Sequence, residues 1–358
     1  MNAKSGDPAL ETLMLPFADG SLAWPDEGAL FLRARDGWPL RSRALPGLVC
    51  EQSFQPDAQA LQRAGFEVRV PGGTTEREGE AWPLVLLLPP RQRDEARALF
   101  AEALARVRPG GVVVASMAND AGAKSGEADL ARLAGPVASR SKHKCRVFWA
   151  QAGSKDGDAT LAAQWRALDA PRPVLGGRFS SRPGVFAWDR VDIASALLAE
   201  HLPTDLQGHA ADLGAGFGYL SAELLQRCHG VTALDVYEAE ARALDLARVN
   251  LAPYAARVAL DFRWHDVTGG LPDRYDAIVT NPPFHAQVGA ERPDIGRAFI
   301  VAAADALKPG GRLWLVANRH LPYEAVLDAR FGDVRLVAQR QGFKVVEAVK
   351  TAGRRARR

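Results

Sequence analysis

The chain carries the same order of structural signals twice, and this duplication limits its possible folds more than any other feature. In the first half, an apolar run at residues 84–88 ends at a proline pair, and a helical stretch leads to Pro109-Gly110-Gly111 and a strand. In the second half, residues 277–279 end at Pro282-Pro283, and a helical stretch leads to Pro309-Gly310-Gly311 and another strand. Because strands that alternate with helices form parallel sheets, the sequence predicts two copies of one α/β unit.

Periodicity and turn residues predict the elements of each copy. The expected strands lie at 47–50, 66–70, 84–88 and 112–114 in the first copy, and at 210–213, 231–234, 277–279 and 312–316 in the second. The expected helices lie at 57–64 and 93–107 in the first copy, and at 193–198, 221–226 and 297–307 in the second. The fold class is therefore α/β, with two tandem Rossmann-like domains. We place them at residues 1–165 and 166–358, because a Gly-, Ser- and Pro-rich stretch joins the copies.

Composition fits a globular protein that works in a reducing compartment. Of the 358 residues, 47% are hydrophobic and 24% are charged, and no apolar run approaches the length of a membrane span. The three cysteines are far apart and form no CxxC pair, so we expect free thiols, no metal site and a cytoplasmic protein. The basic character lies in the C-terminal tail, residues 354–358, which can contact phosphates or serve as a solvated end.

The stretch DAIVTNPPF, residues 276–284, carries the strongest chemical signal. Two consecutive prolines end the strand and hold Asn281 at its carboxyl end, where open α/β sheets bind ligands. The Asn281 amide oxygen, the Pro282 carbonyl, the rigid Pro283 and the ring of Phe284 suit a planar group that bears an NH2. Taken alone, the tetrapeptide is equally compatible with an ordinary proline-rich turn.

A glycine loop, Asp212 to Gly218, follows the first strand of the second copy and opens a helix. Gly214, Gly216 and Gly218 permit a tight turn and a close approach of a ligand to the backbone. Tyr219 stands where the dinucleotide fingerprint requires its third glycine, which disfavours a nicotinamide oxidoreductase. An acid before the loop suits a cationic ligand, so we predict S-adenosylmethionine, with Asp212 near its amino acid end.

Two further acids are candidates for the cofactor site. We expect Asp235 to end the next strand and to accept the ribose hydroxyls. We expect Asp266, which follows a strand near Trp264, to face the adenine edge. Each residue has a structural alternative, since Asp235 can cap a helix and Asp266 can be a turn residue.

The first copy lacks these features. Leu88 stands where the second copy has Asn281, and it cannot accept a hydrogen bond. We place residues 51–55 of the first copy at the position of the glycine loop, and they contain no glycine. The sequence therefore predicts one active domain and one that kept the fold but lost the site.

Residues 183–347 resemble the bacterial ribosomal RNA guanine-N(2) methyltransferases of the small-subunit type. The matching stretches are PGVFAWDRVDIASALL, ADLGAGFGYLS, VTNPPFH, VANRHLPYE and GFKV. The first half resembles the degenerate N-terminal domain of the same family, notably at residues 123–125 and 142–145. The resemblance implies methyl transfer from S-adenosylmethionine to the exocyclic amine of a guanine in 16S ribosomal RNA, within the small subunit. We expect the protein to act as a monomer.

Other functions share parts of these motifs. A sister group modifies large-subunit RNA with nearly the same residues. NPP-aromatic sites also occur in DNA adenine methyltransferases and in glutamine methyltransferases of release factors, although the duplicated α/β first half argues against the latter. A non-catalytic RNA-binding assembly protein would not need an intact glycine loop.

Overall fold

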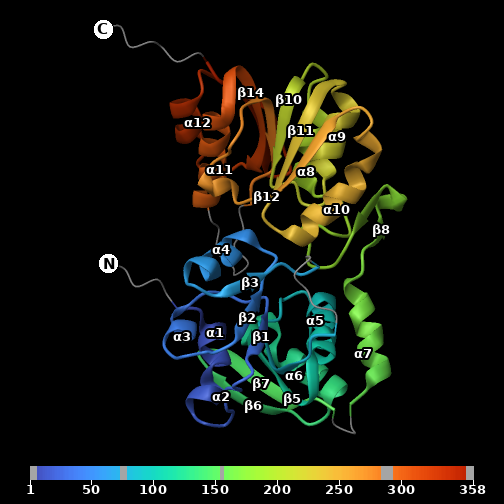
Figure 1. Ribbon diagram of the computed structural model, residues 1–358. Coiled ribbons are helices and arrows are strands. Elements are labelled where there is room, and N and C mark those ends of the chain that lie inside the picture. Colours follow the sequence, from blue (N-terminus) through green and yellow to red (C-terminus); the bar gives the residue numbers. More distant parts are fainter. Residues whose placement is uncertain (1–5, 73–78, 154–156, 284–292, 352–358) are drawn as a thin grey trace. The chain divides into compact units, whose positions relative to one another are not determined.

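The computed structural model describes residues 6–72, 79–153, 157–283 and 293–351. Two predictions, the stacking role of Phe284 and the role of the basic tail, lie outside these residues. The chain divides into two compact units, Met1–Ala170 with Arg182–Gly184 and Pro171–Ser181 with Val185–Arg358. Figure 1 shows each unit as a sheet with helices on both of its faces.

The first unit is built on a seven-stranded sheet with the order β3-β2-β1-β4-β5-β7-β6. Its strands are β1 (Ala29–Leu32), β2 (Leu48–Glu51), β3 (Glu67–Arg69), β4 (Trp82–Leu87), β5 (Val107–Ala118), β6 (Ala138–Lys142) and β7 (Cys145–Gln151). Its helices are α1 (Pro8–Leu13), α2 (Leu15–Ala18), α3 (Trp38–Arg41), α4 (Gln55–Arg63), α5 (Arg93–Arg106), α6 (Ala123–Ala134) and α7 (Ala159–Arg166). All pairs are parallel except those that β7 makes with β5 and β6.

The second unit repeats this sheet with the order β12-β11-β10-β13-β14-β16-β15. Its strands are β10 (Gln207–Leu213), β11 (Gly230–Glu238), β12 (Ala259–Trp264), β13 (Tyr275–Thr280), β14 (Leu307–Asn318), β15 (Asp333–Arg340) and β16 (Phe343–Val349), and a separate hairpin joins β8 (Arg172–Val174) to β9 (Phe179–Ser181). Its helices are α8 (Ile193–His201), α9 (Tyr219–Arg227), α10 (Ala241–Leu251), α11 (Pro293–Ala306) and α12 (Glu324–Arg330). The two sheets confirm the predicted tandem α/β fold.

The registers of the two sheets also correspond residue by residue. Leu32 pairs with Leu87 in the first sheet, as Leu213 pairs with Thr280 in the second. Both Pro-Gly-Gly turns lie inside long strands, β5 and β14, where the pairing with the neighbouring parallel strand shifts register. The two copies therefore share even their irregularities, and positions in one can be compared directly with positions in the other.

Each sheet buries apolar side chains on both faces, because successive residues of a strand point to opposite sides. In β10, Ala210 belongs to the cluster beneath α8, α9 and α10, whereas Ala211 belongs to the cluster beneath α11 and α12. In β1, Leu30 and Phe31 divide in the same way between two clusters. No helix among the described residues is long and apolar enough to cross a membrane.

The structure corrects one alignment of the two copies. The strand β1 is a four-residue apolar run that the sequence analysis missed, and it is the central counterpart of β10. The loop that follows it, residues 33–37, is therefore the counterpart of the glycine loop. The predicted counterpart, residues 51–55, is wrong, because it follows β2 at the next strand of the sheet.

Candidate active site

The carboxyl ends of four neighbouring strands gather polar residues at one edge of the second sheet. In an open parallel sheet this edge is the usual place for a ligand. The residues concerned are Asp212 in β10, Glu238 at the end of β11, Asp266 shortly after β12 and Asn281 directly after β13. The sequence predicted three of these four residues.

The glycine loop leaves β10 in a tight turn that the next strand supports. The N–H groups of Gly214 and Ala215 both donate to the carbonyl of Tyr237, at 2.9 and 3.0 Å. Gly214 and Gly216 have φ of +74° and +58°, in the left-handed region that favours glycine. A Cβ at Gly216 would meet no described atom within 4 Å. The loop therefore has open space beside its backbone, as the close approach of a ligand requires.

Asp212 is a buried acid with one oxygen left free of described partners. Its side chain is 0% exposed, and its Oδ2 accepts a hydrogen bond from Ser221 Oγ at 2.6 Å. Its Oδ1 is buried without a hydrogen-bond partner among the described residues. Burial raises the pKa of Asp212 to about 7, although the Ser221 hydroxyl acts against this. A cation at Oδ1 would satisfy this oxygen and favour the charged form.

Glu238 is a candidate site residue that the sequence did not reveal. Its Oε2 accepts the N–H of Gly216 at 2.7 Å, and its Oε1 accepts the N–H of Glu240 at 2.8 Å. Burial raises the pKa of Glu238, and these backbone N–H groups lower it in part. Glu240 caps α10. An acid two residues before a helix cap, at the end of a strand, is the signal by which sequence reasoning could have found it.

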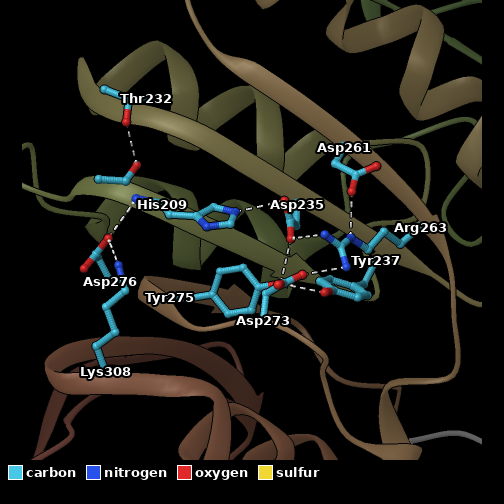
Figure 2. Close-up of polar contacts among 11 residues, drawn as sticks. His209, Thr232, Asp235, Tyr237, Asp261, Arg263, Asp273, Tyr275, Asp276 and Lys308 are labelled. Carbon is cyan, nitrogen blue, oxygen red and sulfur yellow. Dashed lines mark hydrogen bonds and ion pairs between the residues drawn. The ribbon is translucent and has the colours of Figure 1, made fainter.

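The prediction that Asp235 ends its strand is wrong, because β11 continues to Glu238. Asp235 lies inside the sheet and is 4% exposed. Its carboxylate is bonded by His209 Nε2 at 2.9 Å, by the Tyr275 hydroxyl at 2.7 Å and by the Arg263 guanidinium at 3.0 Å. Figure 2 shows these side chains converging on it from three other strands.

This polar network ties β10, β11, β12 and β13 together on one face of the sheet. The Tyr275 hydroxyl also bonds that of Tyr237. Burial raises the pKa of Tyr275, and its bonds to Tyr237 and Asp235 raise it further, so the hydroxyl remains protonated. Because protein groups occupy both oxygens of Asp235, we assign this residue a structural role in place of the predicted contact with a ribose.

Asp266 lies at the predicted edge of the sheet, in a local turn. Its Oδ1 accepts hydrogen bonds from the N–H of Thr268 at 2.9 Å and from the Thr268 hydroxyl at 2.7 Å. It thereby caps a short 3-10 helix, Val267–Gly269. A role toward a ligand stays a prediction for this residue.

The Asn281 side chain is held at its nitrogen and open at its oxygen. Its Nδ2 donates to Asp192 Oδ2 and to Ser195 Oγ, each at 2.9 Å. Its Oδ1 is buried and has no hydrogen-bond partner among the described residues. A buried acceptor without a partner is costly, so this oxygen is a candidate contact for an N–H group of a ligand.

The two prolines after Asn281 differ in exposure, since Pro282 is buried and Pro283 is exposed. Their predicted roles, like that of Phe284, stay predictions. Among the described residues, no group of three or more His, Cys, Asp or Glu side chains could hold a metal ion.

Each sheet has the strand order of the class I methyltransferases, with an antiparallel strand, β7 or β16, in the next-to-last place. Only the second unit joins this fold to a glycine loop and to Asn-Pro-Pro at the adjacent strand end. The fold and the site therefore define a tandem class I methyltransferase in which the second unit carries the candidate active site.

Comparisons with known proteins give the family. The family described as Methyltransferase small domain matches residues 176–347. The "Ribosomal RNA small subunit methyltransferase C" of Pseudomonas paraeruginosa is 32% identical over 297 residues, which are 83% of this chain and 86% of that protein. The protein of the same name from Erwinia tasmaniensis is 32% identical over 73% of this chain and 74% of its own length.

A solved structure agrees with these relatives. It is the T. thermophilus 16S rRNA N2 G1207 methyltransferase (RsmC) in complex with AdoMet and guanosine. It is 26% identical, with a TM-score of 0.78 over 96% of this chain and 92% of that chain. The chain belongs to the ribosomal RNA small subunit methyltransferase C family, which confirms the resemblance drawn from its motifs.

Proposed function

We propose that this protein transfers a methyl group from S-adenosylmethionine to the exocyclic amine of a guanine in 16S ribosomal RNA. The observation that carries this proposal is the buried Oδ1 of Asn281, which faces no described donor at the edge of the sheet that also carries the glycine loop. Guanine has an exocyclic NH2 whose hydrogens such an oxygen can accept. Family membership supports the same reaction.

The second unit has groups that fit S-adenosylmethionine. No described atom lies close enough to Gly216 to keep a ligand from the backbone, and the Oδ1 of Asp212, which has no partner in the described part of the chain, suits the cofactor's ammonium group. Glu238 takes the place that the sequence analysis gave to Asp235, since it stands at the strand end where an acid can accept ribose hydroxyls. Asp266 remains the candidate for the adenine edge. When bound, the cofactor supplies an electrophilic methyl group on a sulfonium centre.

The protein's own residues hold and polarise the acceptor amine. The lone pair of this nitrogen is delocalised into the guanine ring, which makes it a poor nucleophile. Asn281 Oδ1 accepts one N–H of the amine, and we propose that the Pro282 carbonyl accepts the other. Both contacts raise the electron density on nitrogen and fix its position, so positioning and electrostatics carry the reaction without a strong base.

The substrate must present a base that is free of its partner strand. A guanine inside a paired helix cannot reach such a site, so we propose that it is splayed out and stacked on Phe284. We further propose that the target lies within the small ribosomal subunit, and that the protein acts as a cytoplasmic monomer.

The test is methyl transfer from labelled cofactor to three acceptors, namely naked 16S ribosomal RNA, small subunits and large subunits, followed by nucleoside analysis. We expect N2-methylguanosine in small-subunit RNA. Label found in large-subunit RNA or on adenine would contradict the proposed target, and labelled protein would contradict RNA as the substrate.

A further inference from the structure

The helix α8 begins beside the side chain of Asn281. Asp192 caps this helix, and its Oδ2 accepts the N–H of Ser195 at 2.8 Å. A cap aspartate satisfies a free N–H at a helix start in this way, which fixes its own side chain. Ser195 is 8% exposed, so its hydroxyl is also confined. The helix start therefore presents two oxygen atoms in set positions.

Both oxygens accept hydrogen bonds from the Asn281 amide, at 2.9 Å each. A carboxylate oxygen can accept a hydrogen bond but cannot donate one. Asp192 therefore favours the orientation in which the NH2 group of the amide faces it over the flipped orientation, in which the amide oxygen would face it. A flipped amide would place two oxygens against each other and would lose a charge-assisted hydrogen bond. The contact with the helix cap thus decides which end of the amide remains available.

We propose that Asp192 and Ser195 are positioning residues, which hold the Asn281 amide with its oxygen toward the methyl-accepting amine. This inference rests on the proposed function, because it concerns the same amine. The terminal torsion of asparagine has broad, roughly two-fold preferences, so a free amide would present its NH2 for part of the time. An NH2 group cannot accept an N–H of the substrate, and only the fixed orientation is preorganised for it.

The first unit contains the same helix without the same contacts. Its counterpart of α8 is α1, which likewise precedes the central strand and is capped by an aspartate. Asp7 Oδ1 accepts the N–H groups of Ala9 and Leu10, at 3.0 and 3.2 Å. The cap itself is therefore a property of the fold in both copies, and it does not depend on a catalytic asparagine.

The serine and the asparagine that contact each other in the second unit are both replaced in the first unit. Leu10 stands at the place of the serine, and Leu88 stands at the place of the asparagine. Both leucines are buried in one apolar cluster. The second oxygen of Asp7 pairs with Arg35 at 3.1 Å. The first unit thus keeps the capping aspartate, whose second oxygen pairs with an arginine, and has lost the serine together with the asparagine. This is the pattern expected if the serine hydroxyl serves the amide and the aspartate serves both the helix and the amide.

A double-mutant cycle tests the inference. The variants are Ser195→Ala, Asp192→Ser, Asn281→Ala and the combinations of the first two with the third. Asp192→Ser keeps a good helix cap but removes the carboxylate from the amide. Single-turnover methylation of the preferred RNA is measured alongside cofactor affinity and thermal stability, and the wild-type rate reports separately on the proposed function.

We expect Asp192→Ser and Ser195→Ala each to slow methylation, by about tenfold to a hundredfold for the carboxylate and less for the hydroxyl. Cofactor affinity and melting temperature should hold. In the Asn281→Ala background neither change should slow the reaction further, because both act through that amide. Ser195→Thr, which keeps a hydroxyl, should regain most of the lost rate.

Additive losses in the Asn281→Ala background would overturn the inference, since they would show a role that does not pass through the amide. Wild-type-like rates in both single variants would overturn it as well. If Asp192→Ser lowers stability, Ser195→Ala and Ser195→Thr still decide the question, because neither touches the cap. A wild-type protein that methylates no guanine would instead refute the proposed function.

Discussion

The loops that follow β1 and β10 occupy the same place in two copies of one fold and differ at three of their five residues. Residues 33–37 read Arg-Ala-Arg-Asp-Gly, and residues 214–218 read Gly-Ala-Gly-Phe-Gly. In the first unit, Arg33 pairs with Glu95 at 2.6 Å, and Arg35 pairs with Asp7. The first loop is therefore filled by its own side chains, whereas the second leaves its backbone accessible.

The backbone of the first loop begins with the same left-handed conformation as the glycine loop of the second unit. Arg33 has a φ of +53°, close to the +74° of Gly214 at the corresponding position. A left-handed arginine costs about 1 kcal/mol relative to glycine, and the pairing with Glu95 offsets this. The two units thus share the left-handed conformation at the start of this turn, although its side chains differ.

In each unit, a side chain at the end of the neighbouring strand supports the loop through hydrogen bonds. Gln52 accepts the N–H of Phe54 at 2.8 Å and donates to the carbonyl of Ala34 at 2.6 Å. Its counterpart Glu238 accepts backbone N–H groups with both of its oxygens. The amide bridges the first loop without a charge, whereas the carboxylate of the second unit leaves a charge beside the loop. The contact between the loop and the neighbouring strand thus persists in both copies, through a neutral amide in the first unit and a carboxylate in the second.

Asn281→Leu places in the second unit the residue that the first unit has at the corresponding position, Leu88. We expect the largest loss of activity from this variant. Removing one preorganised acceptor should lower single-turnover methylation roughly a hundredfold to a thousandfold. Cofactor affinity, measured by calorimetry, should change little because the loop is untouched. Near-normal turnover would break the comparison, since the leucine would then not account for the predicted inactivity of the first unit.

Glu238→Gln introduces the counterpart of Gln52 and should weaken cofactor binding about tenfold to a hundredfold, because a hydrogen bond to a charged group is lost. Asp235→Ala is the matched control. It should lower the free energy of unfolding by about 1–3 kcal/mol, because the buried partners of Asp235 lose a hydrogen-bond acceptor. It should leave the cofactor affinity of the folded protein unchanged. If calorimetry showed weaker cofactor binding in Asp235→Ala but not in Glu238→Gln, and thermal melts showed the loss of stability in Glu238→Gln instead, the predicted ribose contact would belong to Asp235.

The pKa of Asp212, raised to about 7, makes cofactor affinity depend on pH. The cofactor's ammonium group favours the ionised carboxylate, so binding should weaken as pH falls below 7, by up to about tenfold per pH unit, and should release a proton. Calorimetry in buffers of different ionisation enthalpy measures this release. A pH-independent affinity in the wild type, or an unchanged profile in Asp212→Asn, would contradict the assignment.

The same group affects stability in the opposite direction. The folded protein holds a proton on Asp212 up to about pH 7, whereas the unfolded chain releases it near the ordinary value of 3.8. This group therefore favours folding below pH 4, and its contribution is lost as pH rises toward 7. Denaturant titrations of the wild type and Asp212→Asn between pH 5 and 7 should show the difference in slope.

The smallest expected effect concerns the last hairpin of each sheet. Lys144 has a φ of +58° in the first unit, where the second unit has Gly342 at +84°. Lys144→Gly should stabilise the protein by about 1 kcal/mol, and Gly342→Lys should destabilise it by a similar amount. Chemical denaturation of both variants checks this, and effects of the same sign would contradict the equivalence of the two turns.

The sequence predicted the duplication because prolines and glycines mark strand ends by backbone chemistry alone. It missed β1 because Ala29–Leu32 is a short apolar run without alternation, and its burial comes from the strands on either side. It chose Asp235 over Glu238 because the length of β11 depends on pairing with β12. Propensity within a single stretch does not contain this information.

The candidate site was predictable only as far as residues lie together in the chain. Asn281 could be placed at a strand end from its prolines. Its contacts to Asp192 and Ser195 cross 89 and 86 residues and depend on how α8 packs. The orientation of an amide is therefore a property of the folded structure, although the residues that determine it are visible in the sequence as a helix cap.

The central claim is that one unit binds S-adenosylmethionine and that the other is closed by its own arginines. The most direct measurement is a calorimetric titration of the full-length protein and of Gly216→Arg, which places the first unit's Arg35 in the second loop. The account predicts about one site per chain in the wild type and none in the variant, with both proteins folded by circular dichroism. Two sites per chain, or undiminished binding in Gly216→Arg, would contradict it.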